Sequence, residues 1–188
     1  MGFLRSRKFL GFLLALHLAV LGVCGPVRAQ DQPLQLYEEK IKAGLLYNFL
    51  KYTSWPTDSA GKGGLRVCLL GDGPFDTYLY PLQGRMAQQY VIAITKIANA
   101  SEAGNCSLVY IHRDREDSLP QILQSLRGRH VLTVSDIDQF AAQGGMVEFG
   151  REDQKIDLLI NKNAVDAAGL NIQARLLKLA KLVPGRNG

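Results

Sequence analysis

Residues 131–183 decide the fold and read VLTVSDIDQFAAQGGMVEFGREDQKIDLLINKNAVDAAGLNIQARLLKLAKLV. The stretch opens with an apolar run over residues 131–134, which predicts a short buried strand. Ser135, with Asp138 three residues later, is typical of a helix start, because both side chains can accept hydrogen bonds from unpaired N–H groups. Gly144 and Gly145 predict the end of that helix, since glycine adopts the left-handed cap conformation without a Cβ clash.

The second half of the stretch predicts a hairpin followed by two helices. The turn between the two strands is short, so we expect them to be antiparallel. Asn161 is a favourable N-cap for the next helix, and Gly169 ends it. Leucines at helical spacing indicate a last helix. The predicted elements are strand 146–149, turn 150–153, strand 156–160, helix 162–168 and helix 175–183.

Strands and helices also alternate in the preceding part of the chain. The first helix is amphipathic and is ended by Trp55 and Pro56, because the residue before a proline is pushed out of the helical region. Such alternation predicts one α/β domain with helices on both faces of a mixed, mostly parallel sheet. The predicted elements are helix 36–52, strand 65–70, helix 75–82, strand 90–95, strand 107–112 and helix 116–127.

The first 29 residues have the composition of a cleaved signal peptide. A basic start is followed by an apolar run that is too short for a transmembrane helix, and then by small residues ending at Ala29. We expect cleavage before Gln30, export to the periplasm, and a mature domain over residues 30–188. Lipidation of Cys24 is disfavoured, because the preceding Val23 is bulky where a small residue is required.

The formal net charge of +5 belongs mostly to this leader. Removing its four basic residues from the total of 22 leaves 18, against 17 acidic residues. A mature protein so close to neutral has no basic excess with which to attract nucleic acid, so we expect no nucleic-acid partner.

Two cysteines, Cys68 and Cys106, remain after the leader. An even pair in an exported protein favours a disulfide, and two buried free thiols are the alternative.

The sequence contains no recognisable catalytic or metal-binding motif. His112 and His130 have no carboxylate or cysteine at ligand spacing, and nucleophile elbows, P-loops and paired C-x-x-C motifs do not occur. The turn after the strand 65–70 resembles a phosphate loop, but Asp76 occupies the position of its third glycine. We therefore expect a protein without catalytic residues, cofactor or metal. An exported enzyme of unknown chemistry is the weaker alternative.

Several ordered motifs follow one another along the chain after the leader. They are the segments 42–43, 46–49, Trp55-Pro56 and 67–72, Cys106, S-D-x-x-x-F-A-x-x-G-G-M from Ser135, I-N-x-x-A from Ile160, A-G-L-x-I from Ala168, and R-L-L-K-L-A from Arg175. Together they resemble the YfiR-like family of small periplasmic proteins, which repress a membrane-bound diguanylate cyclase, and the resemblance covers nearly all of the chain after the leader. It supports a disulfide between Cys68 and Cys106, whereas the second cysteine pair of some family members is missing here.

The resemblance implies that the protein binds the periplasmic sensor domain of a diguanylate cyclase, which lowers cyclic di-GMP and biofilm formation. It also implies a second partner, an outer-membrane lipoprotein that binds peptidoglycan and sequesters the repressor. A homodimer is a further option. The residues that we expect at the partner surface are Gly144, Gly145, Met146, Glu148, Asn161 and Arg175.

A small-molecule sensor module acting on another signalling partner is the alternative function. The aromatic side chains near Trp55 and the turn at Asp72 would then line a pocket at the sheet edge. The residues of this hypothetical pocket are Tyr47, Asn48, Trp55 and Asp72.

Overall fold

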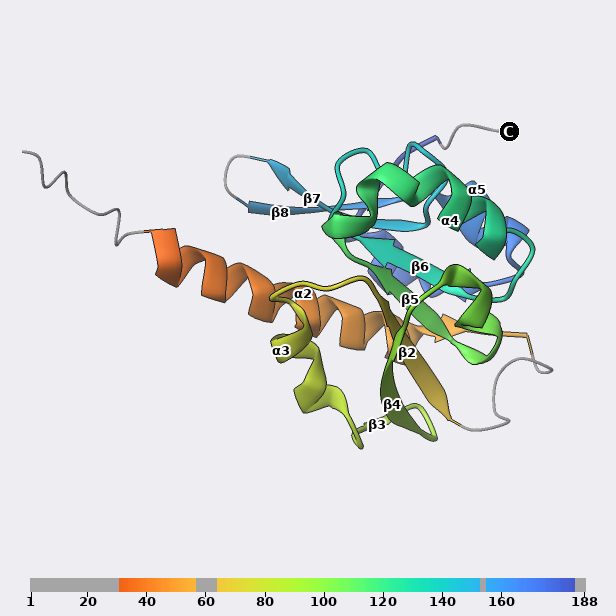
Figure 1. The fold of residues 1–188 in the computed structure, drawn as a ribbon, viewed down its shortest axis with the longest axis horizontal. Helices are drawn as coiled ribbons and strands as arrows, with labels where there is room; N and C mark the ends of the chain where they lie inside the picture. Colours follow the sequence, from red (N-terminus) through yellow and green to blue (C-terminus); the bar gives the residue numbers. More distant parts are fainter. Residues whose placement is uncertain (1–30, 57–63, 153–154, 185–188) are drawn as a thin grey trace, which may run out of the picture. The chain divides into compact units, whose positions relative to one another are not determined.

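The computed structural model describes residues 31–56, 64–152 and 155–184, with side chains from Leu36 onward. The predicted signal peptide and its cleavage site lie outside the described residues. One mixed sheet dominates the described part (Figure 1). Its strands are β2 (Leu65–Leu70), β3 (Met86–Ala87), β4 (Tyr90–Ile97), β5 (Leu108–Ile111), β6 (Leu132–Ser135), β7 (Val147–Glu152), β8 (Lys155–Ile160) and β10 (Lys181–Leu182).

Across the described part of the sheet, the strand order is β10-β8-β7-β6-β5-β2-β4-β3. Neighbours run parallel except for the pairs β7–β8 and β3–β4, which are antiparallel. The mixed, mostly parallel sheet and the antiparallel hairpin are thus confirmed. A separate antiparallel pair joins β1 (Thr53–Ser54) to β9 (Asn171–Ile172).

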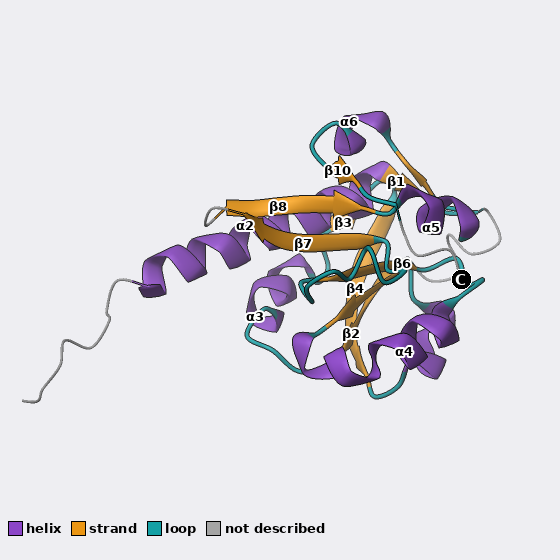
Figure 2. Cartoon of the chain, turned by 90° about the horizontal axis from the view of Figure 1, so that it is seen from above, coloured by secondary structure: helices purple, strands orange, loops and turns teal. Residues whose placement is uncertain are grey.

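Helices cover both faces of the sheet, as predicted (Figure 2). Alternate residues of β2 point to opposite faces: Val67 packs with the α2 and α3 side, and Cys68 with the η2 and α4 side. The helical segments are α2 (Asp31–Tyr52), α3 (Asp76–Leu79), η1 (Tyr80–Leu82), η2 (Ala100–Asn105), η3 (Arg113–Ser118), α4 (Leu119–Leu126), α5 (Lys162–Ala167) and α6 (Ala174–Leu177).

The helix predicted after Ser135 is wrong: residues 138–144 form successive turns. The hydroxyl of Ser135 does accept a hydrogen bond from the Ile137 N–H, so the start signal is real. Gln139 then adopts a φ of +60°, which interrupts helical geometry. The buried carboxylate of Glu148 accepts the N–H groups of Gln139 and Ala141 instead of helical carbonyls.

The helix predicted over residues 175–183 is also wrong. It is reduced to α6, and the chain then extends into β10, which pairs parallel with β8. The N–H of Val183 donates to the carbonyl of Ile160 at 3.0 Å. The free edge of β8 therefore offers backbone partners that outweigh the helical spacing of the leucines. The predicted helix 116–127 is divided between η3 and α4.

Candidate functional site

The double glycine and Met146 form a tight corner before β7. Gly144 has a φ of +110°, which favours glycine. A Cβ on Gly145 would lie 2.2 Å from Cε1 of the buried Phe140 ring. The N–H of Met146 donates to the hydroxyl of Thr133 at 3.1 Å. These contacts give the G-G-M motif a clear structural role.

Two buried polar side chains hold the turns in front of this corner. The Glu148 carboxylate accepts hydrogen bonds from the N–H groups of Gln139 at 3.1 Å and Ala141 at 2.9 Å. The Asn161 amide donates to the carbonyl of Ala141 at 3.0 Å. Its oxygen accepts from the N–H of Ala164 at 3.1 Å, which confirms the predicted N-cap of α5. Both side chains are buried and therefore act on the shape of the surface, not as its exposed contacts.

A groove of about 780 Å³ lies beside this corner, between α4 and α5. Three residues expected at the partner surface line it: Gly144, Met146 and Asn161. Its size is within the range of small-molecule sites. Other lining residues are Leu123, Leu126, Arg127, Gly128, Thr133, Gln143, Asn163, Ala164, Ala167 and Ala168.

Arg175, the sixth residue expected at the partner surface, does not line this groove. Its guanidinium lies over the ring of Tyr52, at 4.3 Å from the ring centroid. Tyr52 is the last residue of α2, and Tyr47 of the predicted ligand pocket is on the same helix. The hydroxyl of Tyr47 donates to the carbonyl of Met86 at 2.8 Å. Asn48 is half-buried beside it. The structure therefore places Arg175, Tyr47 and Asn48 around the outer side of α2.

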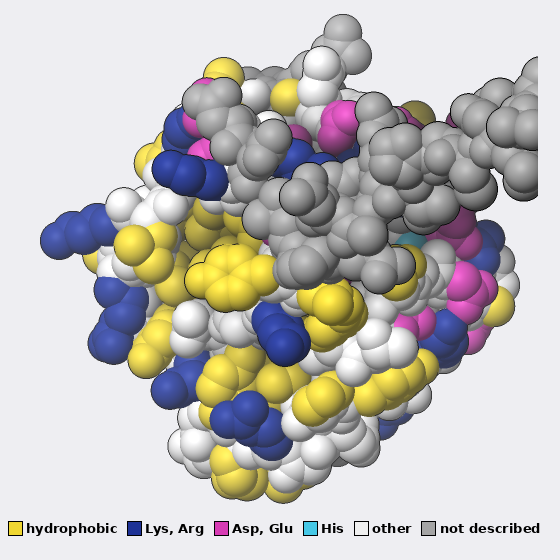
Figure 3. All heavy atoms as spheres, turned by 90° about the vertical axis from the view of Figure 1, so that its left-hand side faces the viewer, with side chains coloured by type: hydrophobic (Ala, Val, Ile, Leu, Met, Phe, Trp, Pro, Cys, Tyr) yellow, Lys and Arg dark blue, Asp and Glu magenta, His cyan; other side chains and the backbone are white. Residues whose placement is uncertain are grey.

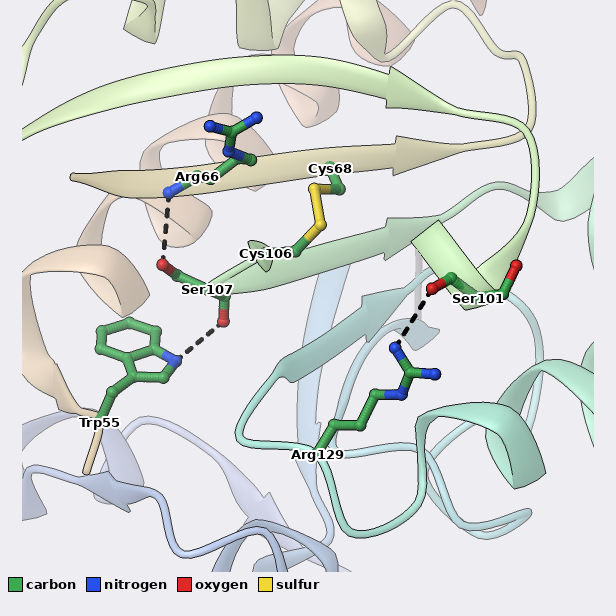
Figure 4. Close-up of a disulfide and its surroundings, with 7 residues drawn as sticks. All are labelled: Trp55, Arg66, Cys68, Ser101, Cys106, Ser107 and Arg129. Atoms are coloured by element: carbon green, nitrogen blue, oxygen red, sulfur yellow. Dashed lines mark hydrogen bonds between the residues drawn. A yellow bond between two sulfur atoms is a disulfide. The ribbon is translucent and has the colours of Figure 1, made fainter. Parts of the chain in front are cut away.

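The other two residues of the predicted ligand pocket lie at opposite ends of β2. The indole N–H of Trp55 donates to the carbonyl of Ser107, at the amino end of β5 (Figure 4). Asp72 follows the carboxyl end of β2 and pairs with Lys96. Since β2 has six residues at about 3.3 Å each, roughly 20 Å separates its two ends. The structure does not bring Trp55 and Asp72 together.

A polar cluster that the sequence analysis missed lies at the carboxyl ends of β2 and β4. His112 and Asp76 are buried, with 2.7 Å between Nε2 and Oδ1. Lys96 contacts Asp76 at 2.9 Å and also lowers the pKa of the exposed Asp72 through a hydrogen bond and its charge. The cluster lies where β2 is flanked by β4 and β5, the position where α/β sheets often bind ligands.

Within the described structure, this position is closed by the protein's own side chains. A Cβ on Gly73 would lie 2.5 Å from Nδ1 of His112, so the turn after β2 packs directly on the imidazole. Only the strand order brings Asp76, Lys96 and His112 together, which explains why their spacing in the sequence gave no signal.

A disulfide joins Cys68 to Cys106, as expected (Figure 4). The Cα atoms are 5.9 Å apart, and the bond links the middle of β2 to the segment before β5. The adjacent Ser107 hydroxyl accepts a hydrogen bond from the N–H of Arg66 at 3.3 Å. Both sulfur-bearing side chains are buried in the core on the α4 side, so the bond is part of the packed interior.

Among the described residues, no group of His, Cys, Asp and Glu side chains is arranged to hold a metal ion. In the same part of the chain, no helix is long and apolar enough to cross a membrane. Two surfaces remain as candidates for binding: the α4–α5 groove and the outer side of α2. An α/β domain with candidate interaction surfaces is the class of protein that this arrangement defines.

Residues 39–181 match the model of the YfiR/HmsC-like family, and the chain belongs to that family. The family comprises periplasmic regulatory proteins, which are not catalytic and are associated with diguanylate cyclases. No curated protein matches the chain.

Two solved structures share the fold at low sequence identity. One is the ABC domain from Streptococcus pneumonia in complex with L-Trp, at 9% identity and a TM-score of 0.52, covering 78% of this chain and 60% of that one. The other is a conserved domain protein from Vibrio cholerae, at 9% identity and a TM-score of 0.53, with coverages of 77% and 59%. The chain thus spans about three fifths of each structure, and these similarities concern the fold alone.

Proposed function

We propose that this protein is a periplasmic repressor that binds the sensor domain of a membrane diguanylate cyclase. Binding lowers cyclic di-GMP production and biofilm formation. The observation that carries this proposal is the family match over residues 39–181. The disulfide, which joins β2 to the segment before β5, supports a protein made for an oxidising compartment.

Repression of this kind follows from mass action. A repressor shifts the cyclase only in proportion to its higher affinity for the inactive state. A shift from mostly active to mostly inactive cyclase needs about a 10⁴-fold difference in affinity between the two states. An outer-membrane lipoprotein that binds peptidoglycan would relieve repression by competing for the repressor.

Export is part of the proposal. We propose that the leader is removed after Ala29 and that the mature protein begins at Gln30. Mass spectrometry of the protein recovered from periplasmic extract tests this, and a mature mass that retains the leader would contradict it.

The main test is binding of the oxidised mature protein to the purified periplasmic domain of a diguanylate cyclase from the same genome, by calorimetry. We expect saturable binding, together with lower cyclic di-GMP when both full-length proteins are co-expressed. Absence of binding under oxidising conditions would rule out the proposed function.

A small-molecule sensor is the second candidate, because the α4–α5 groove has the volume of a ligand site. Thermal-shift measurement with a metabolite panel tests it, using Ala164→Trp to fill the groove from α5. A ligand that stabilises the wild type and not this variant would support the sensor. Stabilisation of both proteins would place the ligand elsewhere.

A further inference from the structure

The outer side of α2 is an exposed helix face without acidic residues. From Leu36 to Tyr52, the only acidic residues of α2 are Glu38 and Glu39, and both are buried. With about 3.6 residues per turn, the exposed and half-buried positions recur on one side of the helix. We call this surface the α2 strip. It is about 25 Å long, at about 1.5 Å per residue, and consists mainly of Leu36, Tyr37, Lys40, Ile41, Tyr47 and Lys51.

In the first half of α2, as far as its side chains are described, several apolar side chains face outward and several charged side chains face inward. Leu36 and Tyr37 remain 52% and 64% exposed, whereas Lys42 is only 6% exposed. Lys42 reaches inward to Asp136 at 3.0 Å, and Glu38 pairs with Arg151. The remaining inward positions of α2, among them Leu46 and Phe49, are fully buried in the core. A helix that carries apolar residues on both sides normally has both sides covered, whereas Leu36 and Tyr37 on the α2 strip stay exposed within the described part of the protein.

Cations are held on the α2 strip by aromatic rings. Arg85 lies 4.7 Å from the centroid of Tyr47, and Lys51 lies 5.6 Å from the same ring and 5.3 Å from that of Tyr52. Arg175 also lies over the Tyr52 ring, at 4.3 Å from its centroid. Among the described residues, none of these cations makes a salt bridge with a carboxylate. Their positions are fixed by cation–π contacts, and their charge remains available to a partner.

The space-filling view also shows basic and hydrophobic side chains next to one another. Figure 3 shows one face of the molecule on which Lys and Arg side chains stand between hydrophobic ones, with acidic side chains toward its margins. Tyrosine and arginine are among the residue types that most often dominate the binding energy of protein interfaces.

We propose that the α2 strip is the docking surface for the periplasmic domain of the cyclase, through a segment that presents carboxylates between apolar side chains. This inference rests on the proposed function and adds the surface and the chemistry of its partner. Carboxylates would pair with Lys40, Lys51 and Arg85, while apolar side chains would cover Tyr37 and Ile41.

A second copy of the chain fits this surface less well. Two copies related by a two-fold axis would place basic strip against basic strip, and like charges in contact are destabilising. An anionic membrane also fits less well. The large aliphatic side chains are confined to one end, at Leu36 and Ile41, whereas Gly44, Asn48 and the tyrosines occupy the rest.

The test compares charge reversals on opposite faces of the sheet, with the same cyclase periplasmic domain as probe. Lys40→Glu and Arg85→Glu alter the α2 strip, and Arg127→Glu is the matched control. All three side chains are exposed, and Arg127 lies at the end of α4, across the sheet, where it lines the groove. We expect each strip variant to raise Kd by about tenfold and the double variant by about 100-fold, with Arg127→Glu unchanged.

The possible outcomes separate the two proposals. If the wild-type protein does not bind the domain, the proposed function is wrong, and this inference with it. If the wild type binds and the double strip variant binds equally well, the function stands and the inference is wrong. A loss confined to Arg127→Glu would move the interface to the groove. Unchanged thermal unfolding of each variant confirms that it is folded.

Two further measurements on the same proteins test whether a second copy of the chain or an anionic membrane occupies the α2 strip instead. Sedimentation velocity would show a wild-type dimer lost in the double variant if the strip bound a second copy. Flotation with phosphatidylglycerol vesicles would show binding lost in the double variant if the strip bound lipid. Either result, with cyclase binding retained, would overturn the inference.

Discussion

Gly145 shows how a single hydrogen in place of a side chain can fix a corner of the fold. The position faces the ring of Phe140, which is fully buried and cannot move aside. Gly145→Ala should therefore destabilise the protein by about 1–3 kcal/mol, the usual cost of overpacking a core. Urea denaturation measures this. Gly104→Ala is the control, because a Cβ there meets nothing within 4 Å, and an equal loss in both variants would contradict the prediction.

The ionisation of Tyr110 should make the free energy of unfolding depend on pH in the alkaline range. Burial raises the pKa of its hydroxyl well above the usual value, and the charge of nearby Asp136 raises it further. A pKa that is higher in the folded state means that stability is complete below the unfolded pKa of about 10 and falls as the pH rises through the folded value.

We expect the wild-type free energy of unfolding to fall above about pH 10, and Tyr110→Phe to remove the part of that fall that belongs to this hydroxyl. The measurement is urea unfolding of both proteins at several values from pH 8 upward. Parallel curves for the two proteins would show that Tyr110 does not control the alkaline limit.

At the scale of elements, α2 depends on buried ion pairs, one of which, with Asp136, its own sequence does not reveal. Lys42 lies between Glu39 at 3.1 Å and Asp136 at 3.0 Å, and all three side chains are at least partly buried. Lys42→Met leaves two carboxylates without their cation and should cost about 3 kcal/mol, near the lower end for a buried pair because Asp136 keeps some exposure.

Lys40→Met provides the comparison, since it removes an exposed lysine from the opposite side of the same helix. Thermal unfolding should separate the two variants clearly, with Lys40→Met close to the wild type. Equal melting temperatures for both variants would mean that the ion pairs of Lys42 contribute little.

The turns over residues 138–144 illustrate the limit of local pattern at this scale. Ser135 has the residue type and spacing of a helix start, and its hydroxyl does accept a nearby N–H. However, Glu148 accepts two backbone N–H groups of the segment from the neighbouring strand β7. A partner on another element thus took the place of helical carbonyls for these two N–H groups, and nothing within residues 135–145 could show this.

At the scale of the whole molecule, the disulfide connects β2 to the segment before its neighbouring strand β5. Cys68 and Cys106 are 38 residues apart, for which loop entropy suggests about 3–4 kcal/mol of stabilisation. The double variant Cys68→Ala, Cys106→Ala should therefore lose about that amount in urea denaturation. We also expect it to repress the cyclase less, because a smaller fraction of the protein is folded.

Reductant provides the internal control for this prediction. It should lower the stability of the wild type to that of the double variant and leave the variant unchanged. If the double variant melted and repressed like the wild type, the disulfide would have no role in stability or regulation.

The sequence alone determined the elements whose signals are local. The strand periodicity of residues 65–70, the N-cap at Asn161 and the hairpin of β7 and β8 all follow from neighbours within a few positions. The family-like motifs and the cysteine pair were readable in the same way.

Only the tertiary structure decided which distant residues meet. It closed the carboxyl end of β2 with His112 and Asp76, separated Trp55 from Asp72, and turned part of the expected last helix into β10. It also directed Lys42 inward and left Tyr37 outside. The physical reason is that strand order and buried charge pairs are set by free-energy differences between whole arrangements of the chain, which local periodicity does not contain.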